Sequence, residues 1–344
     1  MRRRTFLETF ATLGAVGLSA CSRGPRLNVY NWSDYIAPDT IANFEREFGV
    51  AVRYATYESN QEMLAQVMSG NSGWDIVFPS ADFVVPMREL ALLAQLDAQQ
   101  LPNRKALEKT FAAPPWDPEL RWSIPYMHGA TGILYQKSRM PEPRAWEDLW
   151  DTTLQGKITM LDDAPEVFAA CLKKLGRSLN SGDSTELNSA KNEALKQKPL
   201  LRAYLNAEVR DQAVSGDVIA AQAWAVTAAQ AIAAAPGKLG FAYPKEGFPR
   251  FADNAVILRE SRSSELAHQF INYLLRPEVA ASIALTTHTA TANGEAQRLL
   301  PAKVREDPVL YPLPDVYAKA EWFQPQSAAS QRMRDRLWTE IKSA

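Results

Sequence analysis

Four consecutive residues near the start of the chain combine the groups that bind a cation. Trp32, Ser33, Asp34 and Tyr35 place a hydroxyl and a carboxylate between two aromatic rings. An aromatic face attracts a cation, and a nearby carboxylate supplies the opposite charge. The apolar residues 27–31 precede this segment and predict a β-strand, so the four residues follow a strand end. The segment therefore predicts one wall of a cation-binding site.

Similar residues recur where other predicted strands end or begin. Aromatic, hydroxyl and carboxylate side chains stand within a few residues of nearly every strand. In open parallel sheets, ligands bind outside the carboxyl ends of the strands, so these side chains are expected to converge on one site. Their recurrence is more informative than any single motif. The residues concerned are Ser80, Asp82, Asp163, Glu166, Trp224, Phe251 and Asp253.

The elements that would position these residues alternate between strands and helices. Short apolar and β-branched runs predict the strands, whereas apolar residues at helical spacing predict the helices, and Gly49 stands where a glycine would end the first helix. This alternation predicts an α/β fold with a parallel sheet and helices on both of its faces. The predicted strands are 27–31, 50–56, 75–80, 132–135, 157–161, 217–221 and 255–258, and the predicted helices are 39–48, 60–69, 146–150, 165–174, 264–275 and 277–286, with others through Met87 and up to Ala235.

Each candidate residue also has a purely structural interpretation. Asp163 and Glu166 have the spacing of a capping box, in which the Asp caps the first turn of a helix and the Glu bonds back. Large aromatic residues such as Trp32 and Trp224 pack in a core more often than they contact a ligand. Asp253 is compatible with the capping of a turn. The sequence alone leaves these alternatives open.

The first 21 residues match the signal of an exported lipoprotein. A basic segment with Arg3 and Arg4 fits the twin-arginine export pattern, and a short apolar run follows it. Residues 18–21 then match a lipobox, in which cleavage before Cys21 frees its thiol for acylation. The apolar run is too short to span a bilayer. We therefore expect 1–21 to be a signal peptide with lipobox and Cys21 to anchor the mature chain to the membrane.

The composition of the mature chain excludes a nucleic-acid partner. Removing residues 1–20 removes three Arg and one Glu, which leaves 35 basic and 38 acidic side chains and a formal net charge of −3. A nucleic-acid-binding domain is usually strongly basic. The other cysteine, Cys171, has no partner if Cys21 carries lipid, so we expect it to be a small buried residue. The length of the mature chain, about 320 residues, predicts two domains.

Several longer motifs resemble a known family. They occur in order through most of the mature chain. With these motifs the chain resembles the periplasmic polyamine-binding proteins of spermidine/putrescine ABC importers. The motifs are YNWSDYIAP (30–38), YESNQ (57–61), VFPS (77–80), SIPY (123–126), LDDAPEVF (161–168) and YPKEG (243–247).

The resemblance implies a role for each candidate residue. Aromatic side chains would flank the alkyl chain of the amine, while carboxylates and hydroxyls would bind its ammonium groups. The resemblance implies neither a cofactor nor a metal. The aromatic positions are Trp32, Tyr35, Trp224 and Phe251. The carboxylate and hydroxyl positions are Ser33, Asp34, Ser80, Asp82, Asp163, Glu166 and Asp253.

The resemblance also implies a two-lobe periplasmic binding protein fold of type II, with the ligand cleft between the lobes. Lobe 1 would comprise 27–128 plus 252–298, and lobe 2 would comprise 129–251 plus 299–344. The lobes would close around the ligand by hinge motion. A monomer of this kind, which is not an enzyme, would bind putrescine or spermidine in the periplasm and deliver it to the permease of an ABC transporter.

Some positions depart from the family pattern and leave the identity of the polyamine open. Phe251 stands where the spermidine binders have Trp and resembles the putrescine branch, but Thr227 stands where that branch has Asp. Asp82 replaces a Tyr or Ser, which suggests that one carboxylate has moved across the cleft. Thr289 falls near a position usually held by Tyr. His128 replaces an aromatic residue near the crossover between the lobes, which predicts a pH-sensitive site.

Two other functions are compatible with the sequence. Asp163 and Glu166 could serve an exported hydrolase, because glycosidases use two carboxylates. However, acids three residues apart on one helix are an unfavourable flanking pair, and the histidines lack metal-ligand spacing. The second alternative keeps the binding fold and changes the ligand to another cationic amine or a guanidine compound. A metal ligand would call for clustered His, Tyr or Cys residues.

Overall fold

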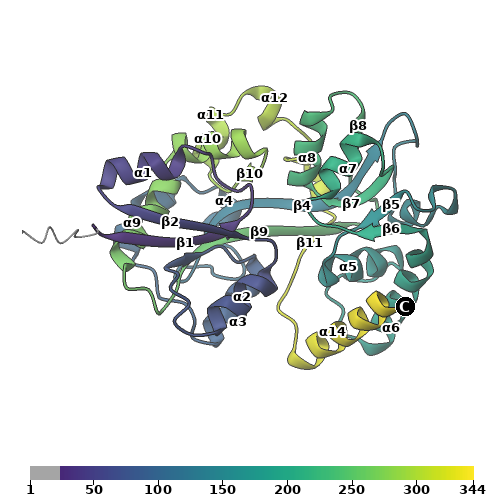
Figure 1. Ribbon diagram of the computed structural model, residues 1–344, viewed down its shortest axis with the longest axis horizontal. Coiled ribbons are helices and arrows are strands. Elements are labelled where there is room, and N and C mark those ends of the chain that lie inside the picture. Colours follow the sequence, from purple (N-terminus) through teal and green to yellow (C-terminus); the bar gives the residue numbers. More distant parts are fainter. Residues whose placement is uncertain (1–23) are drawn as a thin grey trace, which may run out of the picture.

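The structure is a computed structural model that describes residues 24–344, and the predicted signal peptide with Cys21 lies outside these residues. The strands join into one sheet that runs along the length of the molecule (Figure 1). They are β1 (Arg26–Trp32), β2 (Ala51–Tyr57), β3 (Ile76–Val77), β4 (Ile124–Gln136), β5 (Ile158–Met160), β6 (Leu201–Tyr204), β7 (Ala220–Trp224), β8 (Leu239–Ala242), β9 (Phe248–Ile257), β10 (Ala290–Thr291) and β11 (Ala320–Trp322).

Helices cover both faces of this sheet (Figure 1). The α-helices are α1 (Thr40–Phe48), α2 (Asn60–Met68), α3 (Ala81–Glu89), α4 (Lys109–Ala112), α5 (Ala164–Lys174), α6 (Ser184–Gln197), α7 (Val209–Ser215), α8 (Ala225–Ala234), α9 (Ser264–Leu274), α10 (Pro277–Thr287), α11 (Gly294–Leu299), α12 (Ala302–Arg305), α13 (Pro314–Tyr317) and α14 (Ala328–Ser343). The 3-10 helices are Ala98–Gln100, Pro102–Ala106, Trp146–Trp150, Thr152–Leu154 and Lys198–Leu200.

The sheet is parallel toward its two ends and antiparallel in the middle. Its order is β2-β1-β3-β9-β4-β7-β5-β6, with β8 and β10 beside β4 and β11 beside β9. β1 is parallel to β2 and β3, and β5 is parallel to β6 and β7. β4 and β9 are antiparallel to each other and to their neighbours β7 and β3. The prediction of a parallel sheet was therefore wrong for its centre, because β4 and β9 carry the chain across the molecule in opposite directions (Figure 1).

Two large hydrophobic cores divide the molecule. One core contains buried residues of 27–127 and 252–292, and we call the region around it lobe 1. The second contains buried residues of 130–248 together with Leu337 and Ile341 of α14, and we call its region lobe 2. A smaller core under α7 and α8 extends lobe 2. β4 and β9 pass from one core to the other and join the lobes.

The local signals at helix ends place α1 and α5 as the sequence predicts. Gly49 follows α1 with φ of 66° and donates its N–H to Glu45, which ends the helix in a left-handed cap. Asp163 precedes α5, and its side chain accepts a hydrogen bond from the N–H of Glu166 at 3.1 Å. The capping prediction for Asp163 is confirmed. Glu166 does not complete the reciprocal capping box, because its side chain turns to other partners.

The crossing strands are longer than the sequence predicts. Every residue of β4 is buried, so its sequence lacks the alternation of a half-exposed strand, and only 132–135 was predicted. β9 likewise extends well before the predicted start at 255, so Asp253 lies within a strand instead of before one. Residues that form α6 and α14 were not predicted as helices. Both helices pack around lobe 2 and leave their polar faces in solvent.

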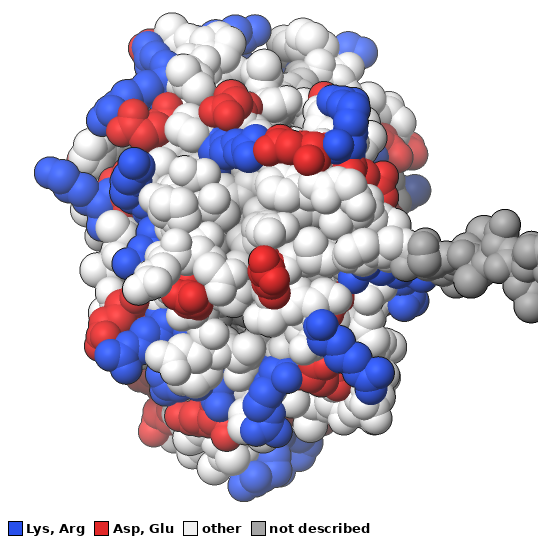
Figure 2. Space-filling view, turned by 90° about the vertical axis from the view of Figure 1, so that its left-hand side faces the viewer, with Lys and Arg blue, Asp and Glu red and all other residues white. Residues whose placement is uncertain are grey.

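The described surface carries a mixture of charges. Figure 2 shows Lys and Arg side chains interspersed with Asp and Glu side chains over the face that it views. Cys171 is fully buried in the core of lobe 2, as predicted, and burial raises the pKa of its thiol. Within residues 24–344, none of the helices combines the length and the apolar character that a membrane span requires.

Candidate functional site

A cavity of about 120 Å³ lies between the two lobes. Its walls come from the loops after β1, β2 and β3, the first turns of α3 and α5, the end of β7 and the middle of β9. All eleven residues that the sequence proposes as ligand contacts line this cavity. They are Trp32, Ser33, Asp34, Tyr35, Ser80, Asp82, Asp163, Glu166, Trp224, Phe251 and Asp253.

Asp253 is the carboxylate of the crossing strand. It lies in β9, is 2% exposed, and both of its oxygens accept hydrogen bonds from lobe 1. The Ser80 hydroxyl donates to Oδ1 at 2.6 Å, and the Tyr35 hydroxyl donates to Oδ2 at 3.1 Å. Asn60 in turn donates to the Ser80 hydroxyl at 3.0 Å. These bonds fix the carboxylate in one orientation at the cavity wall.

Aromatic residues of lobe 1 are held in place by hydrogen bonds at their polar ends. The indole N–H of Trp32 donates to the carbonyl of Phe78 at 2.8 Å, and its ring lies 6.4 Å from that of Tyr35. Tyr126 of β4 donates its hydroxyl to the backbone carbonyl of Tyr35 at 2.7 Å. An aromatic residue with a satisfied polar end keeps a fixed ring plane. Trp32 and Tyr35 therefore present a preformed apolar wall.

Glu166 is the corresponding carboxylate of lobe 2. It stands in the first turn of α5 and is 3% exposed. Its Oε1 accepts hydrogen bonds from the Thr131 hydroxyl at 2.9 Å and from the Trp224 indole at 3.0 Å. Its Oε2 is buried and has no hydrogen-bond partner among the described residues. A buried oxygen of this kind needs a donor, and the cavity is where a donor can come from.

Four carboxyl groups of the cavity have raised pKa values, first of all because burial disfavours their charged forms. The pKa is raised to about 7 for Asp82, about 6 for Asp163, about 8 for Glu166 and about 7 for Asp253. Neighbouring carboxylates raise these values further; for example, Asp163 and Asp82 both act on Glu166. These carboxyl groups therefore hold protons more readily than exposed ones do, and a cation in the cavity would favour their charged forms.

A glycine makes room for Phe251 on the cavity wall. Gly129 of β4 is the cross-strand partner of Phe251 of β9. A Cβ atom at position 129 would lie 2.7 Å from Cζ of the Phe251 ring, which is closer than carbon atoms approach each other. The outer end of the ring therefore comes close to the backbone of β4. Only glycine at position 129 permits this close approach.

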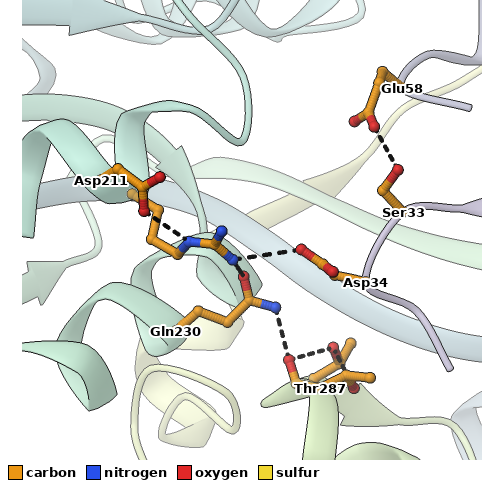
Figure 3. A network of polar contacts seen from close by, with 8 residues as sticks. Ser33, Asp34, Glu58, Asp211, Gln230 and Thr287 are labelled. Atoms are coloured by element: carbon orange, nitrogen blue, oxygen red, sulfur yellow. Dashed lines mark hydrogen bonds and ion pairs between the residues drawn. The ribbon is translucent and has the colours of Figure 1, made fainter. Parts of the chain in front are cut away.

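The rim of the cavity carries a polar network that joins the lobes (Figure 3). The guanidinium of Arg210 from α7 lies 3.4 Å from a carboxylate oxygen of Asp34 and 3.3 Å from the side-chain oxygen of Gln230. Gln230 donates to the backbone carbonyl of Thr287 at 2.9 Å. Asp34 and Thr287 belong to lobe 1, whereas Arg210 and Gln230 belong to lobe 2. On the lobe 1 side, the Ser33 hydroxyl donates to Glu58.

Known proteins are similar to this chain in sequence and in fold. The family model for bacterial extracellular solute-binding proteins matches residues 39–312. The putrescine-binding periplasmic protein PotF of Escherichia coli is 35% identical over 337 residues, which cover 92% of this chain and 91% of PotF. The chain belongs to the family of bacterial extracellular solute-binding proteins. The resemblance to periplasmic polyamine-binding proteins of ABC importers is confirmed by these matches.

Solved structures of this solute-binding family confirm the two-lobe fold. The spermidine/putrescine ABC transporter substrate-binding protein PotD of Streptococcus pneumoniae superimposes with a TM-score of 0.81 and 29% identity, covering 93% of this chain and 99% of PotD. The Tp0655 (TpPotD) lipoprotein of Treponema pallidum superimposes with a TM-score of 0.82 and 28% identity, covering 92% and 99%. The predicted α/β fold with two lobes is therefore correct.

Some residues at this solute-binding site were not proposed from the sequence. Glu58 and Asn60 belong to a motif that carried the resemblance, and that motif was the signal that could have found them. Phe323 directly follows β11, a strand that was not predicted from the sequence. Arg210 carries no sequence signal, because α7 was not predicted. Gln230 lies on α8, within the helix predicted up to Ala235, but nothing in the sequence marks it as a cavity residue.

His128 does not give the site its expected pH sensitivity. It is 8% exposed, and burial lowers its pKa to about 4. The imidazole therefore stays neutral above about pH 5, since a group is almost fully deprotonated one unit above its pKa. Its ring contacts the rings of Phe111 and Tyr311. Among the described residues, no cluster of three His, Cys, Asp or Glu side chains is arranged to hold a metal ion.

Proposed function

We propose that this protein binds a polyamine, putrescine or spermidine, in the periplasm and delivers it to the permease of an ABC transporter for uptake. The proposal rests on one observation above all. Asp82, Asp163, Glu166 and Asp253 meet in one cavity between two lobes, and none of the described residues that line the cavity is a Lys or an Arg. A ligand that carries several positive charges supplies the cations with which these carboxylates can pair.

The aromatic residues fit the rest of such a ligand. A polyamine has apolar methylene segments between its ammonium groups, and Trp32, Trp224 and Phe251 offer apolar faces along the same cavity. Burial of four methylenes contributes about 3 kcal/mol. Two or three cation–π contacts add about 1 kcal/mol each. A micromolar site needs about 8 kcal/mol, so the carboxylates must supply the remainder through charge-assisted hydrogen bonds.

The same charges exclude other small metabolites. An amino acid would place its own carboxylate near Asp163, Glu166 or Asp253, where like charges repel. We propose that the cavity only binds its ligand and carries out no catalysis. Asp163 and Glu166 stand three residues apart at the start of one helix, which is an unfavourable arrangement for two acids that flank a bond. The relatives in the comparison are named as binding proteins, which supports the same assignment.

Isothermal titration calorimetry of the purified mature protein tests the function. We expect putrescine, cadaverine, spermidine or spermine to bind with a dissociation constant in the micromolar range or below. Agmatine serves as the guanidine comparator and glutamate as the anionic control. If none of the four polyamines binds at millimolar concentration, the proposal is wrong, and if agmatine binds more tightly than all of them the guanidine alternative replaces it.

We further propose that the mature protein is a lipid-anchored monomer with Cys21 as the acylated residue. The sequence of residues 18–21 supports this assignment, and the Treponema pallidum structure in the comparison is that of a lipoprotein. The proposed lobes, 27–128 plus 252–298 and 129–251 plus 299–344, would close on the ligand and present the closed form to the permease. Mass spectrometry of membrane-extracted protein tests the anchor. A mature N-terminus without acyl chains on Cys21 would contradict it.

A further inference from the structure

Asp82 adds a carboxylate to the cavity at a position where the resembling family has Tyr or Ser. It stands in the first turn of α3, two residues after Ser80, which precedes that helix. Its side chain is half-buried and lines the cavity. Among the described residues, no other side chain donates a hydrogen bond to its carboxylate. Within the described residues, the carboxylate of Asp82 therefore has no side-chain partner, and only the first turn of α3 favours its charge.

The neighbours of Asp82 are also acidic. Asp163, Glu166 and Asp253 line the same cavity, and each interacts electrostatically with at least one other member of the group. Arg210 is a basic residue that contacts cavity residues, but its contacts are with Asp34 and Gln230 and with none of these four acids. Glu166 adds independent evidence of a missing donor, since its buried Oε2 has no partner.

We propose that Asp82 is a specificity-determining residue that makes the cavity select polyamines with three or more ammonium groups over diamines. This inference rests on the proposed function and adds the class of polyamine. A diamine supplies two positive charges for these four carboxylates, so two of the carboxylates remain without a cation. A triamine supplies a third charge for Asp82 and Asp163, which line the same cavity and lie close enough for Asp163 to raise the pKa of Asp82.

Each lobe contributes two of the four carboxylates, which suits a ligand with several ammonium groups. Asp82 and Asp253 belong to elements of lobe 1, whereas Asp163 and Glu166 belong to the start of α5 in lobe 2. An ammonium group bound between the walls can donate to both lobes at once. Each added ammonium group therefore contributes to closure as well as to binding, because it has hydrogen-bond partners on both sides only in the closed form.

Calorimetry of the wild type and of Asp82→Asn with putrescine, spermidine and spermine tests the inference. For the wild type at pH 7.5, we expect spermidine to bind at least about tenfold more tightly than putrescine. Asp82→Asn keeps the shape of the side chain and removes its charge. We expect it to weaken spermidine binding at least about tenfold and putrescine binding less than about threefold, so that the selectivity is lost.

Asp162→Asn is the matched control. Asp162 precedes Asp163 in sequence but is exposed, does not line the cavity, and pairs with Lys342 at 2.6 Å. We expect this variant to keep the wild-type ratio of spermidine to putrescine affinity. Asp82→Glu restores the charge and should restore part of the selectivity, which a merely structural role of Asp82 would not predict.

The failure of this inference differs from the failure of the proposed function. If wild-type protein binds putrescine as tightly as spermidine, or if Asp82→Asn keeps the selectivity, Asp82 is not a specificity residue while polyamine binding stands. If no polyamine binds to the wild type, the proposed function itself is wrong. Thermal unfolding of each variant, followed by circular dichroism, checks that a loss of binding is not a loss of fold.

Discussion

The guanidinium of Arg210 in lobe 2 lies 3.4 Å from the carboxylate of Asp34 in lobe 1, so an ion pair spans the mouth of the ligand cavity (Figure 3). The resemblance to polyamine-binding proteins implies that Asp34 receives a terminal amine of the ligand. In this structure Asp34 instead meets a cation of the protein. Asp34 has φ of 55°, and its side chain is 63% exposed, which places it at the rim and not in the interior.

The ion pair is expected to be weak but to influence closure. Exposed pairs contribute about 0–1 kcal/mol to stability, because water and salt screen them. Across a cleft, even this small amount applies only to the closed form and therefore shifts the balance between open and closed states. Gln230 strengthens the link, since it contacts Arg210 and also donates to Thr287 in lobe 1.

We predict that Arg210→Gln opens the ligand-free protein without unfolding it. The change removes the contact to Asp34, so the open form should become more populated and the radius of gyration in small-angle X-ray scattering should increase. The free energy of unfolding should change by less than about 1 kcal/mol. Arg202→Gln is the control, because Arg202 is also exposed but contacts only Gln212 of its own lobe. Equal scattering curves for wild type and Arg210→Gln would contradict the prediction.

Asp253→Asn should weaken polyamine binding at least about tenfold, since a charge-assisted hydrogen bond contributes roughly twice as much as a neutral one. The Ser80 and Tyr35 hydroxyls can rotate to pair with an amide, so the fold should tolerate the change. Titration calorimetry measures the affinity. Tyr35→Phe separates the two contributions, because it removes one donor to Asp253 but keeps the carboxylate charge. An unchanged affinity in Asp253→Asn would remove this residue from the proposed site.

Gly129→Ala should displace the ring of Phe251 and weaken the binding of every polyamine. A Cβ atom would lie 2.7 Å from the ring, so the ring or strand β4 must move. Overpacking of this kind costs about 1–3 kcal/mol of stability. Thermal unfolding measures the stability, and calorimetry measures the affinity. The double variant Gly129→Ala/Phe251→Leu relieves the contact and should recover stability but not affinity. If the single variant is as stable as the wild type, the close approach does not constrain the site.

The sequence predicts the site better than it predicts the sheet that carries it. Residues such as Trp32 and Asp163 follow predicted strands, and the rule that ligands bind at strand ends brings them together correctly. The full lengths of β4 and β9 could not be predicted, because these strands are largely buried and have no alternation of polar and apolar residues. Their antiparallel pairing depends on the path of the chain between lobes, which local sequence does not encode.

The charges at the rim could not be predicted for a related reason. Arg210 is 35% exposed and stands on a seven-residue helix that the sequence pattern did not reveal. Its contact with Asp34 joins residues 176 positions apart in different lobes. Whether Asp34 pairs with a ligand or with the protein depends on this contact. Sequence reasoning can therefore name the carboxylates of the site, but only the fold shows which of them already has a cation.

The raised pKa values predict that polyamine affinity falls as the pH falls. The pKa is raised to about 8 for Glu166 and to about 7 for both Asp82 and Asp253, so these groups bind protons in the ligand-free protein below these pH values. An ammonium ligand favours their charged forms and must displace those protons. Between pH 8 and pH 6 we expect the affinity for spermidine to decrease at least about tenfold, since each displaced proton contributes up to about tenfold per pH unit. Calorimetry in two buffers of different ionisation enthalpy measures the released protons directly.

The same groups predict the opposite trend for the stability of the ligand-free protein. In the unfolded chain, Asp and Glu titrate near about pH 4, whereas in the folded protein these carboxyl groups titrate near 6 to 8. The folded state therefore holds more protons between these values. The stabilisation from these groups is complete below about pH 4 and is lost as the pH rises through the folded pKa values. A saturating polyamine should then raise the melting temperature more at pH 8 than at pH 5.5. In Glu166→Gln, which cannot titrate, this difference should be smaller, and an equal difference would show that the carboxyl groups of the cavity do not govern it.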